Sequence, residues 1–214
     1  MSSIVAAVAG VVLGLSLAAP PGPMNAVIAE ESVVRGVRAG VSAGLGAMSA
    51  DACFLVLAWV GVATVLRDAP RLQGTLLAIG GLLLLVFAFD AVRDVRRFTP
   101  DAEASGGRGF VKAFSLSLTN PFQLLWWLTV GVTLLDPGTM ALSLGPIEAT
   151  IATGSPAIVA GFFAGIAIWI TAFPAALVAL GRRIDGFAPL VAVGSAAVLA
   201  AFGLLFLYRA AAAL

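Results

Sequence analysis

One acidic residue stands in the middle of a long apolar stretch of this sequence. Asp51 lies within residues 39–66, among small and aliphatic side chains. If this stretch crosses a membrane, an ionised carboxylate at its centre is costly, so the residue is a candidate functional group. No Lys, Arg or His lies at a similar depth to pair with it. We therefore expect Asp51 to be protonated when no ligand is bound, or paired with an ammonium group, Na⁺ or H⁺. The alternative is a neutral Asp that bonds backbone carbonyls.

A proline-rich segment interrupts the first apolar stretch, residues 4–29. Pro20, Pro21 and Pro23 lie within four residues, with Gly22 among them. Because proline lacks an N–H, these residues predict that one helix ends and another begins here. The unpaired backbone groups cannot face lipid, so they must be buried or line a cavity. Gly22 suits the N-cap and Pro23 the first position of a new helix, whose free N–H groups favour a carboxylate. A purely structural kink is the alternative.

A second break is predicted in the apolar stretch 113–135. Asn120 followed by Pro121 is typical of an N-cap and a first helical position. A lone proline kink is the alternative here. The two breaks and the buried acid together predict one polar site among the helices. Its candidate substrate-binding residues are Pro21, Gly22, Pro23, Asn25, Asp51, Asn120 and Pro121, and Asp51 is also the candidate coupling-ion site.

The elements that must position these residues are apolar helices. Of the 214 residues, 61% are hydrophobic and 11% are charged, whereas a soluble domain has about 25% charged residues. We therefore predict an all-α integral membrane protein, with residues 1–214 forming one six-helix domain. Splitting the helices three and three gives halves of opposite orientation, each opening with a proline-broken helix, as in inverted-repeat transporters. The six predicted spans, each of about 20 residues or more, are 4–29, 39–66, 72–92, 113–135, 157–180 and 187–208.

The charged residues predict an orientation and exclude several functions. Nine of the 12 Lys and Arg residues lie in the first, third and fifth connections. This bias predicts that these connections, including residues 93–112, are cytoplasmic and that both termini are outside. The net charge of +1 provides no basic surface for nucleic acid. The absence of His and the single cysteine, Cys53, exclude imidazole-based sites and an internal disulfide. We expect no cofactor, no resident metal ion and no enzymatic activity.

Other conspicuous residues are expected to have structural roles. Glu30 and Glu31 lie near the end of their stretch, so we expect them to face solvent or lipid headgroups. Trp126 and Trp127, about one turn past the second break, are either packing residues or a pocket wall. Packing roles are expected for Gly10, Gly14, Gly161, Gly165, Trp59 and Trp169.

The order of these motifs resembles that of the lysine exporter (LysE/RhtB) family. The shared features are Pro21-Gly22-Pro23, a Gly-rich second helix with Ser49-Ala50-Asp51, an Arg-bearing third connection and Asn120-Pro121. The resemblance implies six helices and secondary, cation- or proton-coupled export of amino acids or related small solutes. An Asp in the second helix resembles the branch that exports basic amino acids. Many members continue Asn-Pro with Lys, whereas Phe122 stands at that position here.

The residues and the resemblance together predict a secondary exporter in the cell membrane. Helix N-termini would bind a substrate carboxylate, Asp51 would bind an ammonium group or the coupling H⁺ or Na⁺, and rocking of the two halves would give alternating access. The expected partners are a small-molecule substrate, the lipid bilayer and a second copy of the chain in a homodimer. The alternative is a metal-cation exporter of the same architecture, with Asp51, Asn120 and freed carbonyl groups as hard oxygen ligands.

Overall fold

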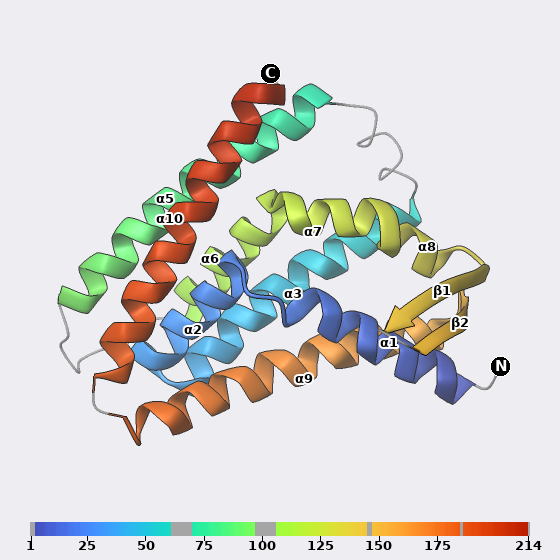
Figure 1. Cartoon of the computed structure of the whole chain (residues 1–214), viewed down its shortest axis with the longest axis horizontal. Coiled ribbons are helices and arrows are strands. Elements are labelled where there is room, and N and C mark those ends of the chain that lie inside the picture. Colours follow the sequence, from blue (N-terminus) through green and yellow to red (C-terminus); the bar gives the residue numbers. More distant parts are fainter. Residues whose placement is uncertain (1–2, 61–69, 97–105, 145–146, 185, 214) are drawn as a thin grey trace.

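The computed structural model describes residues 3–60, 70–96, 106–144, 147–184 and 186–213. These residues form helices joined by short connections, apart from one β-hairpin (Figure 1). The hairpin strands are β1 (Gly138–Leu144) and β2 (Ile147–Thr153). The helices are α1 (Ser3–Ala18), α2 (Pro23–Arg35), α3 (Val37–Trp59), α5 (Pro70–Arg96), α6 (Gly106–Thr119), α7 (Pro121–Trp126), the π-helix η1 (Trp127–Gly131), α8 (Val132–Leu135), α9 (Pro156–Gly181) and α10 (Phe187–Ala213).

Two helix interruptions lie where the prolines predicted them. Between α1 and α2, residues 19–22 are not helical, and the two helix axes bend by 82°. Between α6 and α7, Asn120 leaves the helix and α7 begins at Pro121. Both follow from the same local chemistry, because proline removes a helical N–H donor and restricts the residue before it.

Several helices are long and apolar enough to cross a bilayer. They are α3, α9 and the segment Pro189–Ala211 of α10, and the bent pair of α1 and α2 passes the same test as one unit. The apolar part of α5 is shorter, at Gly74–Phe89. By length and composition, the described residues thus contain three candidate spans, or four with the bent pair. This composition fits a multi-pass membrane protein, while the arrangement as six spans in two inverted halves stays a prediction.

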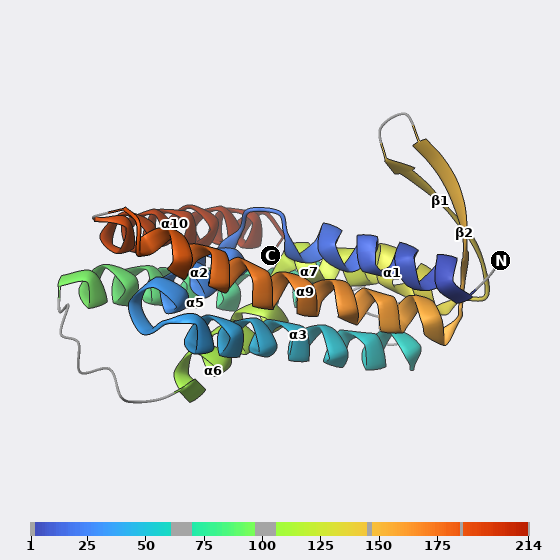
Figure 2. The same cartoon turned by 90° about the horizontal axis from the view of Figure 1, so that it is seen from below.

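The helix ends gather at opposite ends of an elongated molecule. The α2–α3 junction, the N-terminal end of α6 and the α9–α10 junction lie together, at the left of Figure 1. The N-terminus, the end of α3 and the hairpin lie at the other end, and Figure 2 shows the hairpin projecting away from the helices. Connections that the basic residues predict to share one side of the membrane therefore share one end of the molecule. Which end is cytoplasmic stays a prediction.

Glycines bring α1 and α9 into direct backbone contact, and the two helices lie side by side in both views (Figures 1 and 2). A Cβ added to Gly10 would collide with the carbonyl oxygen of Ile158, and one added to Gly161 would collide with that of Ala7. The same holds one turn along, at Gly14 and Gly165. The predicted packing role of these two small-residue pairs is confirmed.

The hairpin is an addition to the predicted helical fold. β1 and β2 pair antiparallel, with Gly138 opposite Thr153 and Leu144 opposite Ile147. The Thr153 hydroxyl donates a 2.7 Å hydrogen bond to the carbonyl of Asp136, which fastens the base of the hairpin to the end of α8. Thr and Ile recur in β2, and such β-branched residues favour strands.

Candidate functional site

The side chain of Asn25 stabilises the break between α1 and α2 by hydrogen bonds. The Asn25 amide nitrogen donates hydrogen bonds to the carbonyls of Ala18 (2.7 Å) and Pro20 (2.8 Å). The Asn25 carbonyl oxygen accepts a 2.9 Å bond from the indole N–H of Trp169 in α9. Because these contacts satisfy backbone groups that the helix no longer pairs, Asn25 stabilises the non-helical segment. Trp169, expected only to pack, thus also has a polar contact with the break.

The start of α2 presents a free helix end. Gly22 is the N-cap in an extended conformation and Pro23 is the first helical residue, as predicted. The first helical backbone bond runs from the N–H of Ala26 to the carbonyl of Gly22, and no side chain caps this end. An uncapped helix N-terminus carries partial positive charge and unused N–H donors, and is suited to bind an anion such as a carboxylate.

Asp51 lies across from this end and is held by two neutral donors. Its side chain is buried, with the residue 4% exposed. The Gln123 amide (2.6 Å) and the Trp127 indole N–H (2.8 Å) both donate to Oδ1. Its second oxygen, Oδ2, has no hydrogen bond among the described residues. Asp51 is thus held as an acceptor of side-chain hydrogen bonds, in contrast to the alternative of a neutral Asp that bonds backbone carbonyls.

The helix after the second break is shaped to bring these donors to Asp51. Gln123 and Trp127 are four residues apart, so they lie on the same helix face. The helix then widens into the π-helix η1, and a Cβ on Gly131 would collide with the Trp127 indole. A glycine is therefore needed for the ring to occupy its place. Single π turns of this kind occur often at functional sites.

The two breaks and Asp51 surround one cavity of about 290 Å³. Six of the seven predicted site residues line it, namely Pro21, Gly22, Pro23, Asn25, Asp51 and Asn120. Pro121, the seventh, is the first residue of α7, and its side chain lies outside the described part of the structure. The rest of the wall is mainly apolar and consists of Leu17, Ala18, Pro20, Met24, Ile28, Ala47, Gln123, Ile166, Trp169, Ile170 and Phe202.

Gln123 and Trp169 are site residues that sequence reasoning missed. Gln123 carries an amide within an apolar stretch, three residues after Asn120 and four before a tryptophan, and that spacing was the available signal. No comparable signal marked Trp169, which comes to the cavity from a helix far away in the chain. Trp127, one of the two candidates for a pocket wall, contacts Asp51 without lining the cavity itself.

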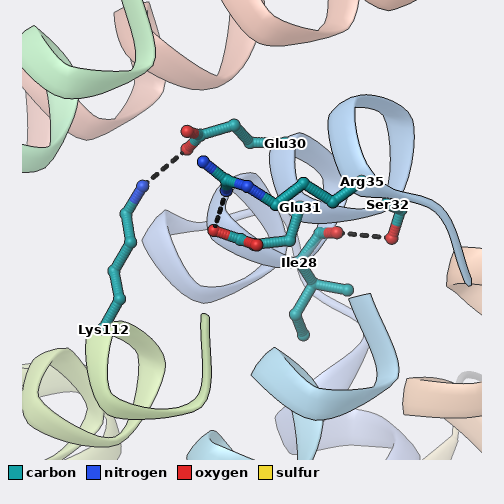
Figure 3. A network of polar contacts seen from close by, with 6 residues as sticks. All are labelled: Ile28, Glu30, Glu31, Ser32, Arg35 and Lys112. Atoms are coloured by element: carbon teal, nitrogen blue, oxygen red, sulfur yellow. Dashed lines mark hydrogen bonds and ion pairs between the residues drawn. The ribbon is translucent and has the colours of Figure 1, made fainter. Parts of the chain in front are cut away.

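The prediction that Glu30 and Glu31 face solvent or headgroups was wrong. Both are buried, and each forms an ion pair: Glu30 with Lys112 of α6 at 2.7 Å, and Glu31 with Arg35 at 2.6 Å (Figure 3). The physical reason is that α6 begins at Gly106, ahead of the apolar stretch 113–135. Lys112 is therefore helical and reaches across to α2 instead of lying in a connection.

The metal-exporter alternative gains no support from the site. Within the described part of the chain, no three His, Cys, Asp or Glu side chains are grouped so as to hold a metal ion. Asp51 is the one acid among the residues that line the cavity.

A family model described as LysE type translocator matches residues 15–210, which include both breaks and all the lining residues. The chain belongs to the LysE type translocator family. Its helical, apolar architecture around a central cavity is thus that of a membrane translocator. No solved structure matches the chain significantly.

Curated relatives of this LysE translocator carry names that refer to efflux. The chain is 33% identical over 125 residues to "Putative amino acid efflux protein YcgF" of Bacillus subtilis (strain 168), covering 56% of this chain and 59% of that one. It is 31% identical over 120 residues to "Leucine efflux protein" of Salmonella choleraesuis (strain SC-B67), covering 54% and 57%. The chain spans little more than half the length of the curated relatives that it matches.

Proposed function

We propose that this LysE translocator is a secondary exporter of amino acids across the cell membrane. The observation that carries the proposal is that two complementary groups line one buried cavity: the free Oδ2 of Asp51 and the uncapped N-terminus of α2. A carboxylate oxygen binds an ammonium group, and helix N–H groups bind a carboxylate. An α-amino acid carries both groups on one carbon atom.

The rest of the cavity favours a small substrate with an apolar side chain. A volume of about 290 Å³ lies at the lower limit of ligand pockets, which run from about 300 to 1,000 Å³. Ile28, Ile166, Ile170 and Phe202 provide an apolar wall. A basic substrate has a second ammonium group, and the lining residues offer no second carboxylate for it. We therefore favour neutral over basic amino acids, and the relative named leucine efflux protein supports this choice.

Transport follows from alternating exposure of the cavity to the two sides of the membrane. In this proposal six spans form two inverted halves that rock against each other, with both termini outside and residues 93–112 cytoplasmic. Asp51 binds the substrate ammonium group and exchanges it for the coupling H⁺ or Na⁺. A single carboxylate that serves both cations in turn couples their movements, because the two cannot occupy it together.

The test is efflux from cells preloaded with labelled leucine, alanine or lysine, with and without the protein. We expect faster efflux of the neutral amino acids and little change for lysine. Asp51→Asn should reduce neutral amino-acid efflux by about two orders of magnitude, because an amide does not neutralise the buried ammonium group. The control is Arg182→Gln, at an exposed residue of the α9–α10 junction, which should retain efflux.

Two results would contradict the proposal. One is unchanged efflux of all three amino acids when the protein is present in the membrane at normal abundance. The other is efflux by Asp51→Asn that equals that of the unmodified protein under the same ion gradient, which would remove Asp51 from both substrate binding and coupling.

A further inference from the structure

Helix α2 is a short rod between two non-helical joints. At its N-terminal end stand the non-helical residues 19–22. At its C-terminal end Gly36 has φ +90° and ψ 175°, a conformation that is essentially restricted to glycine. Nothing lies within 4 Å of the position that a Cβ on Gly36 would take, so this joint has open space around it. Such element-terminal positions absorb the backbone rotations of hinge motions.

Two side-chain contacts tie this rod to α6. The Lys112 ammonium group lies 2.7 Å from a carboxylate oxygen of Glu30, and Figure 3 shows it reaching across from α6. The Ser117 hydroxyl donates to the Met24 sulfur at 2.9 Å. Along α2, Met24 is near the cavity and Glu30 is closer to the α2–α3 junction. The ion pair therefore lies between the cavity and that end of the molecule.

The ion pair is almost sealed from solvent. The side chain of Glu30 is 1% exposed and that of Lys112 is 11% exposed. A buried ion pair adds little stability compared with apolar residues of similar size, because both ions lose their hydration. Stability alone therefore gives no reason for a charged pair at this position. The ion pair is distinctive because it holds two helices in one relative position. The attraction between its two charges is lost as soon as the helices separate.

Lys112 has a second favourable contact. Its ammonium group lies 5.2 Å from the centroid of the Phe87 ring of α5. A cation over an aromatic face is stabilised by the ring quadrupole, and more so where water is excluded. Lys112 therefore keeps a partner if Glu30 moves away with α2.

We propose that Glu30 and Lys112 form the latch of a gate that closes the cavity on the side of the α2–α3 junction. The gate opens when α2 swings about residues 19–22 and Gly36, away from α6, and Lys112 remains on Phe87. The proposal rests on the transport function proposed above, since a gate serves alternating access. The ion pair between Glu31 and Arg35 lies within α2 and moves with it, so it is not part of the latch.

The test measures access to the cavity without any substrate. The chain has one cysteine, Cys53, so Cys53→Ala gives a cysteine-free background. Ala47→Cys then places one reporter thiol in the cavity wall. Its reaction with a membrane-impermeant maleimide is timed in right-side-out and in inside-out vesicles. We expect Glu30→Gln and Lys112→Met each to speed labelling about tenfold in one vesicle orientation only, equivalent to about 1.4 kcal/mol in favour of the open state.

Matched variants separate the latch from general loosening of the helices. Ser32→Ala removes a buried hydrogen bond from the Ser32 hydroxyl to the Ile28 carbonyl within α2 and should leave the labelling rate unchanged. The exchange Glu30→Lys with Lys112→Glu and the conservative Lys112→Arg both keep a bridging pair, so they should label slowly. If Glu30→Gln and Lys112→Met fail to fold, the charge exchange and Lys112→Arg still test the proposal, because fast labelling in either of them overturns it. Labelling rates of Glu30→Gln and Lys112→Met equal to that of the reporter alone also overturn the proposal, as does an equal acceleration by Ser32→Ala.

The outcome is independent of the substrate proposed above. A failure to export amino acids leaves the labelling result standing, and a failure of the latch leaves the efflux result standing.

Discussion

The two halves of the first broken span are held by opposite kinds of contact. α1 packs on α9, and the sequences of both helices contain no charged residue. Where they meet, glycines place one backbone directly on the other, as at Gly161. α2 also packs on α3, α9 and α10, but it meets α6 through the tips of side chains, Glu30 with Lys112 and Met24 with Ser117.

This difference assigns different mechanical roles to the two halves. Backbone packed on backbone leaves no room for sliding, because close-packed interfaces change in discrete steps and not continuously. Contacts between side-chain tips separate and re-form through rotamer changes. α1 with α9 is thus suited to be the fixed frame about which the two halves pivot, and the contact of α2 with α6 is suited to be the one that opens. The non-helical residues 19–22 join α1 to α2, and Pro20, Pro21 and Gly22 of this segment line the cavity.

The largest effect on stability is expected at the α1–α9 contact. Gly161→Ala puts a methyl group against the carbonyl oxygen of Ala7. We expect the free energy of unfolding in detergent to fall by about 3 kcal/mol, the upper part of the usual range for overpacked sites. The control is Gly194→Ala in α10, where nothing lies within 4 Å of the new Cβ. It should leave stability unchanged or raise it by up to about 1 kcal/mol through helix propensity. Equal stability of the two variants would contradict a rigid frame.

A smaller effect is expected at the joint after α2. Gly36→Ala forces a non-glycine residue to φ +90°, which costs about 1 to 2 kcal/mol unless the backbone rearranges. Gly22→Ala at the other joint is the matched comparison, because φ is −177° there and the nearest atom to a new Cβ is 4.0 Å away. Thermal unfolding of both variants in the same detergent measures the difference. A Gly36→Ala protein as stable as the Gly22→Ala protein would show that this joint tolerates other conformations.

The smallest effect on stability is expected at the ion pair itself, when both partners are replaced together. Glu30→Leu with Lys112→Met substitutes apolar side chains for two buried ions, so the free energy of unfolding should change by less than about 1 kcal/mol. The single variant Lys112→Met should be the less stable protein, because it leaves the Glu30 carboxylate buried without its cation. A double variant much less stable than the single one would show that the pair serves stability and would weaken the contrast between the two halves.

Much of the site could be predicted from local chemistry. Proline cannot donate a helical hydrogen bond wherever it stands, so the breaks at Pro20–Pro23 and at Pro121 follow from residue type alone. An acid in the middle of an apolar stretch is conspicuous without a structure, and Asp51 indeed lines the cavity. The glycine spacing of α1 and α9 likewise indicated a packing face before its partner was known.

The contacts between distant segments could not be predicted in this way. Gln123 follows Asp51 by 72 positions, and Lys112 follows Glu30 by 82. Glu30 and Glu31 looked like solvated residues because burial depends on which helices cover them. The β-hairpin could not be predicted either, since its strands lie in the connection between the predicted spans 113–135 and 157–180, and their pairing depends on contacts between two separate segments.

The sequence by itself thus determined where helices run, where they break and which carboxylate stands in apolar surroundings, because these depend on the covalent structure of each residue and its immediate neighbours. Only the tertiary structure decided that the breaks share one cavity, that Asp51 keeps one free oxygen, and that a buried ion pair ties α2 to α6. Those features depend on the relative placement of helices far apart in the chain. Buried polar groups must find partners wherever packing places them, and the sequence alone does not contain that placement.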